Sequence, residues 1–243
     1  HRDEVARMMV AVDSNGYLKF RPIGGVDPRV LVAKTVVVGA KKIPGVIGSK
    51  PIHLQRPEER ENAFSIQELV IDIGAKSKEE AERLVKLGDI AYFTTKYEEF
   101  GSDKVKAKAL DDRVGCALAI RLLQEKVSFP LIAAFTVQEE VGLRGAGVAA
   151  YQIEPDLALI LEGTTASDVP GTAEHKHATS VGQGPALTGM DRTVIPHPQL
   201  VQELFALAEE KGIQVQVRRN TAGGTDAGRI QLTKAGTKVA VIA

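Results

Sequence analysis

Short apolar runs separated by turn signals fill the chain from Val10 to about Phe100. The turns are marked by Ser14-Asn15-Gly16, Gly24-Gly25, Ile43-Pro44-Gly45 and Gly74. This spacing is typical of a compact β-barrel or sandwich. A further strand is predicted at residues 5–12. One helix is predicted inside the β-rich region, because Ser77 opens a capping-box-like sequence that is followed by Ala81, Leu84 and Val85 at helical spacing.

From about Val105 onward the pattern alternates between strands and helices. Residues 112–126 predict a helix with Val114, Leu118 and Leu122 on one face, and residues 199–211 predict a second helix that ends at Gly212. Buried strands are predicted at 131–137 and 156–161, and further strands at 213–217 and 238–243. Such alternation indicates an α/β domain, a sheet covered by helices. We therefore predict two domains: residues 1–9 with 101–243, which carry the chemistry, and the β-rich residues 10–100.

The charge and cysteine content narrow the classes of partner and compartment. Lys and Arg number 31, as do Asp and Glu, and no basic run is present, which argues against nucleic acid and anionic membranes as partners. The single cysteine, Cys116, suits a reducing compartment, so we expect a cytoplasmic protein. The chain starts at His1, directly before the predicted strand at 5–12, rather than at a Met, and it stops after an apolar run, so we expect residues to be missing at both ends.

Polar residues at the ends of predicted apolar segments are the main chemical signal. The clusters are His1-Arg2-Asp3-Glu4, Asp111-Asp112, Glu139-Glu140 and Glu162. The carboxyl ends of strands border the ligand crevice of an open α/β sheet, so the acids after 131–137 and 156–161 should converge. Converging carboxylates repel one another unless they share protons or a cation, and oxygen with imidazole ligands suits zinc, cobalt or manganese. Taken alone, Glu139-Glu140 is best interpreted as a solvated strand end, and Asp111-Asp112 could simply cap a helix. Taken together, the clusters favour a metal site.

Six stretches of the sequence also carry a resemblance to a known family. They are HRDEV (1–5), KALDDRVGC (108–116), VQEEVGLRGA (137–146), LEGTTASDVPG (161–171), GPALTGMDR (184–192) and GGTDAG (223–228). These look like the successive motifs of the tetrahedral (TET) aminopeptidases, a metallopeptidase family that includes glutamyl aminopeptidases and some enzymes labelled endoglucanase. The resemblance implies a mixed β-sheet flanked by helices, as in zinc peptidases, with an inserted small β-barrel that serves dimerisation. It also implies peptide substrates and homo-oligomers, dimers that build dodecamers.

The resemblance assigns roles to individual residues. It implies metal ligands at His1, Asp111, Glu140 and Glu162, a general base at Glu139, and a hydrogen bond from Asp3 that fixes the His1 tautomer. Asp111 would bridge two metal ions, zinc or cobalt, with manganese as a further choice. The family often has Asp where Glu162 stands, so Asp168 stays open as an alternative ligand. Two departures stand out: the family's fifth ligand, a histidine, would follow Ala243, and Ala6-Arg7 replaces a Gly and an apolar residue.

Such a site predicts an aminopeptidase in which metal-activated water removes the N-terminal residue of a peptide. Arg192, Thr225 and Asp226 are candidates for substrate binding; the alternatives are a surface salt bridge for Arg192 and an ordinary turn with Asp226 as a helix cap. A catalytically incomplete scaffold of the same family is the second hypothesis. A glycoside hydrolase is the third, and it is disfavoured because the chain has no Trp and only 5% aromatic residues.

Overall fold

A computed structural model describes residues 1–243, which divide into two compact units. The first unit is His1–Glu4 with Ala109–Ala243, and the second is Val5–Lys108. The boundaries therefore differ from those predicted at 9/10 and 100/101. Strand β1 (Ala6–Val12) pairs along its length with β2 (Leu18–Ile23), so residues 5–9 belong to the β-rich unit. The hairpin of β7 (Glu98–Phe100) and β8 (Lys104–Lys106) also belongs to it.

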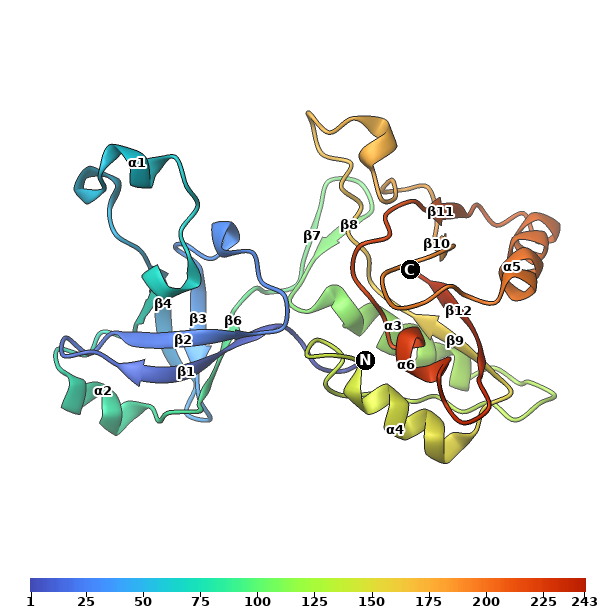
Figure 1. The fold of residues 1–243 in the computed structure, drawn as a ribbon, viewed down its shortest axis with the longest axis horizontal. Coiled ribbons are helices and arrows are strands. Elements are labelled where there is room, and N and C mark those ends of the chain that lie inside the picture. The colour runs from blue at the N-terminus through green and yellow to red at the C-terminus, as the bar shows by residue number, and fades with distance from the viewer. The chain divides into compact units, whose positions relative to one another are not determined.

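The second unit is a closed barrel with the strand order β1-β2-β5-β4-β3-β6, drawn in blue to green in Figure 1. Its remaining strands are β3 (Thr35–Val38), β4 (Ile43–Gly48), β5 (Val70–Asp72) and β6 (Ile90–Phe93). All neighbouring strands are antiparallel, so alternate side chains point inward and fill the barrel. Met9, Leu18, Val38 and Ile71 are among the buried side chains of this core. Of the barrel and the sandwich that the turn spacing allows, the structure has the barrel that the family resemblance implies.

Short helices decorate the barrel. They are α1 (Pro57–Arg60), α2 (Lys78–Leu84) and the 3₁₀ turns Pro28–Val30, Ile52–Leu54 and Ile66–Glu68. Helix α2 begins where the sequence predicts, because the Ser77 hydroxyl accepts a hydrogen bond from the backbone N–H of Glu80 at 3.3 Å. Ala81 on this helix is buried in the barrel core, which explains its position in the helical pattern.

Arg7, the unexpected residue of the opening motif, is fully buried in β1. Its guanidinium carbon lies 3.5 Å from the centre of the Phe93 ring. β1 and β6 are neighbouring strands, with Arg7 opposite Ala91, so this cation–π contact joins the two strands that close the barrel. The contact with the Phe93 ring explains why an arginine is tolerated at this buried position.

The first unit contains a mixed four-stranded sheet with the order β11-β10-β12-β9 (Figure 1). The strands are β9 (Leu157–Leu161), β10 (Ala186–Thr188), β11 (Gln216–Arg218) and β12 (Lys238–Ile242). The helices are α3 (Leu110–Leu123), α4 (Arg144–Ile153), α5 (Pro198–Glu210) and α6 (Ala227–Ile230), with a 3₁₀ turn at Glu174–Lys176. α3 packs on β9, and α5 and α6 pack on β12. The predicted α/β architecture is present, and none of the helices is both long and apolar enough to cross a membrane.

The prediction of a buried strand at 131–137 is wrong. These residues pair with no strand, and Ile132 and Val137 are 62% and 45% exposed. The end of the segment makes other backbone bonds: the N–H of Arg2 donates to the carbonyl of Thr136 at 2.9 Å, and the N–H of Gly145 donates to that of Val137 at 3.0 Å. An apolar run forms a strand only where a partner strand is available, and β9 pairs with β12 alone.

The predicted burial of the strand at 156–161 is partly wrong, since Ile160 alone is buried in β9, and the helix predicted at 112–126 exposes its apolar face. Both elements exist as α3 and β9, but Val114, Leu118 and Leu122 are 44–48% exposed. The buried residues of α3 are instead Asp112 and Gly115. Similarly, the strand predicted at 213–217 is found as β11, at 216–218. Periodicity predicts a helix, whereas tertiary packing decides which of its faces is covered.

Candidate metal centre

Three segments of the first unit bring an imidazole and two carboxylates together. His1 Nε2 lies 3.3 Å from Asp111 Oδ1, at the start of α3, and 3.2 Å from Glu162 Oε1, just after β9. The ligand atoms of these three residues all lie within 4.8 Å of one another. Glu139 Oε2 approaches the same His1 nitrogen at 3.7 Å. Four residues that the sequence singled out therefore surround one point.

Asp3 ties the histidine to the turn that carries Glu139 and Glu140. Its Oδ1 lies 3.2 Å from His1 Nδ1, and its two carboxylate oxygens accept the backbone N–H groups of Glu139 at 3.3 Å and Glu140 at 3.2 Å. The hydrogen bond of His1 Nδ1 goes to the backbone carbonyl of Asp3 at 3.2 Å, and a proton on Nδ1 would leave Nε2 as the coordinating nitrogen. The role of the Asp3 side chain in fixing the His1 tautomer stays a prediction.

Asp112 is a second anchor, and sequence reasoning left it without a role in the site. The side chain is 1% exposed and accepts hydrogen bonds from the backbone nitrogen of His1 at 2.7 Å and from the N–H of Gly115 at 3.0 Å. Burial raises the pKa of Asp112 to about 6. The sequence signal for a buried Asp112 was the glycine three residues later. The structure explains it, because a Cβ at Gly115 would lie 2.4 Å from Asp112 Oδ1 and 2.5 Å from the Leu161 carbonyl oxygen.

The raised pKa values of the clustered carboxylates indicate that a bound cation would stabilise their charged forms. Burial is the main cause that raises the pKa of Glu139 to about 8 and of Glu162 to about 7, and each carboxylate also feels its acidic neighbours. Burial lowers the pKa of His1, but the carboxylates of Asp111, Glu162 and Glu139 outweigh it and raise that pKa to about 12. The cluster thus holds protons that a bound metal ion would displace.

Two buried polar atoms of this cluster lack hydrogen-bond partners. Whether a metal ion fits the site can be judged from them. They are His1 Nε2 and Glu162 Oε2. Buried polar atoms are nearly always satisfied, so each orphan calls for an explanation. An imidazole nitrogen and carboxylate oxygens are the donor set of zinc, cobalt and manganese sites. The residues present therefore fit a divalent metal ion.

The remaining candidate ligands lie differently. Glu140 is half-buried beside Glu139, but it is outside the group of ligand atoms formed by His1, Asp111 and Glu162. Asp168, the alternative to Glu162, accepts a hydrogen bond from the backbone N–H of Val181 at 2.8 Å and also lies outside this group. The geometry therefore favours Glu162.

The three substrate-binding candidates do not form one exposed surface. Thr225 and Asp226 are 7% and 5% exposed, and the Asp226 carboxylate accepts a hydrogen bond from the hydroxyl of Thr136. Arg192 is exposed, and its backbone N–H donates to the carbonyl of Gly223 at 3.0 Å. Only Arg192 is open to solvent in the manner of a substrate-binding side chain.

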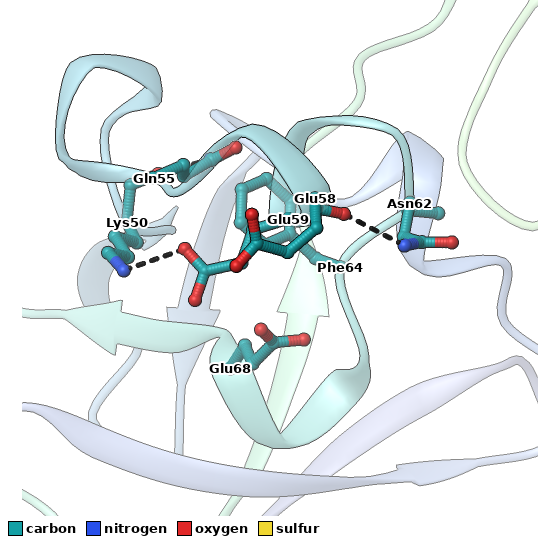
Figure 2. Close-up of a pocket in the computed structure, with 8 residues that line it drawn as sticks. Lys50, Gln55, Glu58, Glu59, Asn62, Phe64 and Glu68 are labelled. Atoms are coloured by element: carbon teal, nitrogen blue, oxygen red, sulfur yellow. Dashed lines mark hydrogen bonds and ion pairs between the residues drawn. The ribbon is translucent and has the colours of Figure 1, made fainter.

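A separate pocket lies wholly within the barrel unit and is shown in Figure 2. Its polar groups are already engaged: Lys50 Nζ lies 2.8 Å from Glu59 Oε2, and Asn62 donates to the carbonyl of Glu58 at 3.1 Å. None of the predicted site residues lines it. The pocket therefore gives no support to a second reaction centre.

Comparison with known proteins agrees with the motifs. An M42 glutamyl aminopeptidase family profile matches residues 1–243. A solved aminopeptidase from Desulfurococcus kamchatkensis is 39% identical with a TM-score of 0.93, over 100% of this chain and 69% of that one. The TET1 peptidase of Pyrococcus horikoshii, which assembles into a tetrahedron or a large octahedral shell, is 33% identical with a TM-score of 0.80, over 100% and 72%. The lysyl aminopeptidase of Pyrococcus furiosus is 32% identical over 100% and 70%. The chain therefore belongs to the M42 glutamyl aminopeptidase family and is an aminopeptidase, a hydrolase of peptide bonds.

Proposed function

We propose that the cluster around His1 removes the N-terminal residue of peptides with the help of two divalent metal ions, zinc or cobalt, with manganese as a further choice. The observation that carries the proposal is the buried Nε2 of His1, which has no hydrogen-bond partner and lies between the carboxylates of Asp111 and Glu162. Together with Glu140 these residues would hold the ions, and Asp111 would bridge them. When bound, the ions supply Lewis acidity, which polarises the scissile carbonyl and activates water.

Glu139 is the residue we assign to proton transfer. Its side chain is 9% exposed and reaches the edge of the cluster, 3.7 Å from His1 Nε2. A carboxylate there can accept the proton of the attacking water and return it to the leaving amine. The backbone of Glu139 is bonded to Asp3, which also contacts the imidazole, so the base and the His1 ring share one support.

Substitution of Glu139 by Gln tests this assignment because Gln keeps the shape and removes the base. We expect bound metal to remain and kcat for release of p-nitroaniline from glutamyl, leucyl and lysyl substrates to fall by about 10²–10⁴-fold. Glu174→Gln, an equivalent change in a 3₁₀ turn of the same unit, is the matched control and should leave kcat unchanged. Unaltered turnover in Glu139→Gln would remove Glu139 from the mechanism. Wild-type chain with neither metal nor activity would favour the scaffold hypothesis.

The assembly and location of the protein are further parts of the proposal. We infer a homo-oligomer, with the barrel as the dimerisation unit and a dodecamer as the larger form, because the similar Pyrococcus horikoshii peptidase forms closed shells. Light scattering on the purified chain tests this directly. The reducing cytoplasm stays our prediction for the compartment, and it rests on the single cysteine.

A further inference from the structure

A buried carboxylate that the mechanism does not use lies at Asp226. The residue is 5% exposed; its Oδ2 accepts a hydrogen bond from the Thr136 hydroxyl, and its Oδ1 is buried without a hydrogen-bond partner. Asp226 directly precedes α6, but its side chain makes no capping bond to that helix. The prediction that Asp226 caps a helix is therefore wrong. Because its side chain is buried against Thr136, direct contact with substrate is disfavoured.

Thr136 connects this carboxylate to the metal centre. Its carbonyl accepts the N–H of Arg2 at 2.9 Å, next to His1. Three and four residues later, the N–H groups of Glu139 and Glu140 donate to Asp3. The segments 1–3 and 136–140 are thus tied together at both ends, and Asp226 holds the Thr136 end from a third segment.

The absence of a strand at 131–137 gives this bond its importance. A segment in a sheet is fixed by its ladder of backbone bonds, but residues 131–137 pair with no strand. The position of Glu139 then depends on the backbone bonds between 137–139 and 142–145, on the Asp3 carboxylate, and on the contacts of Thr136. The hydrogen bond between the Thr136 hydroxyl and Asp226 is the side-chain contact that joins this segment to the start of α6.

We propose that Asp226 and Thr136 form a positioning pair that fixes the 136–140 turn, and with it Glu139, against the His1–Asp3 segment. In this proposal both residues act through the turn and are positioning residues. The inference rests on the proposed function, and it assigns to Asp226 a task other than substrate binding. An error of about 1 Å in the placement of a catalytic group can cost about 100-fold in rate.

Thr136→Val and Thr136→Ser test the pair, since Val keeps the shape and loses the hydroxyl, whereas Ser keeps the hydroxyl. We expect Thr136→Val to lower kcat by about 10–100-fold with KM within about twofold of wild type. Thr136→Ser should restore kcat to within about threefold of wild type. Thr188→Val is the matched control, because Thr188 is 1% exposed and its hydroxyl has no hydrogen-bond partner. It should leave kcat unchanged.

Hydrogen exchange of the amides at 136–140 gives a second readout that does not need turnover. Thr136→Val should speed their exchange by about tenfold or more, while Thr136→Ser and Thr188→Val should not. The inference is overturned if Thr136→Val keeps wild-type kcat and exchange, or if Thr136→Ser loses as much as Thr136→Val. Failure of the proposed function looks different: the wild-type chain itself would release no p-nitroaniline with metal added, and exchange alone would then decide whether the pair fixes the turn.

Discussion

Replacement of Gly115 by Ala should destabilise the first unit strongly, although Gly→Ala in a helix normally stabilises. Gly115 lies in α3, where the helix propensity of Ala alone would gain about 1 kcal/mol. The added Cβ would lie 2.4 Å from Asp112 Oδ1, 2.6 Å from Asp112 Oδ2 and 2.5 Å from the carbonyl oxygen of Leu161. A Cβ atom essentially never lies within 3.0 Å of another non-bonded heavy atom, so the Asp112 carboxylate and the end of β9 must shift.

The size of the effect follows from what the shift disrupts. Overpacking of a buried site costs about 1–3 kcal/mol. Weakening the hydrogen bonds of the Asp112 carboxylate to the His1 nitrogen and the Gly115 N–H costs about 1.5–3 kcal/mol more, because one partner is charged. After the helix propensity of Ala is subtracted, Gly115→Ala should destabilise by about 2–5 kcal/mol. At about 2–4 °C per kcal/mol for a chain of this size, the Tm should fall by about 4–20 °C.

Gly147→Ala provides the matched control in helix α4 of the same unit. A Cβ there would meet only Arg229 Cβ at 3.7 Å, an ordinary contact, so this variant should be as stable as wild type or slightly more stable. Thermal unfolding followed by circular dichroism compares the two variants, and metal content checks the site. If Gly115→Ala unfolds at or above the temperature of Gly147→Ala, the argument that Gly115 makes room for Asp112 is refuted.

Two further predictions concern the metal and the pH. Asp111→Ala should abolish binding of both metal ions as measured by elemental analysis, because Asp111 is the proposed bridge; loss of a single ion would point to a mononuclear site. In the metal-free chain, the pKa values of Glu139 and Glu162 are raised to about 8 and about 7, so the folded form holds protons that the unfolded chain releases. Stability should therefore fall as the pH rises from about 5 to 8, and the raised pKa of His1 acts in the same direction above its ordinary range. The stabilisation by added metal should grow over the same range because its ligands must lose their protons; a metal-free Tm that rises with pH contradicts the shifts.

The sequence predicts the elements of the fold better than their burial. Turn spacing predicts a barrel or a sandwich, of which the structure has the barrel, and the Ser77 cap predicts the start of α2, because these signals are local. Val114 and Leu118 show the limit: the helical period is correct, but both side chains are exposed, since burial depends on which neighbour packs on the helix. The apolar run 131–137 fails as a strand for a related reason, because strand formation needs a partner that the run itself does not specify.

The candidate site shows the same division. Residue types at segment ends were sufficient to single out four polar clusters, and the family resemblance chose His1, Asp111, Glu139 and Glu162 within them. The structure brings these four residues together. The supports of these residues were beyond sequence reasoning. Asp112 resembled a helix cap and Thr136 an ordinary strand residue, and only the three-dimensional arrangement reveals that they hold His1 and the Glu139 turn.

The insertion of the barrel between His1 and Asp112 has a consequence for how the site forms. The hydrogen bond between these two residues spans 111 positions of the sequence, and β1 and β6 close the barrel within that span by pairing Arg7 with Ala91. Once the barrel is closed, the loop that remains to be ordered shrinks to roughly 25 residues, which lowers its closure entropy by about 1 kcal/mol. Folding of the barrel thus reduces the entropy that is lost when the ligands come together. A mutation that unfolds the barrel core would weaken metal binding by roughly fivefold without touching a ligand.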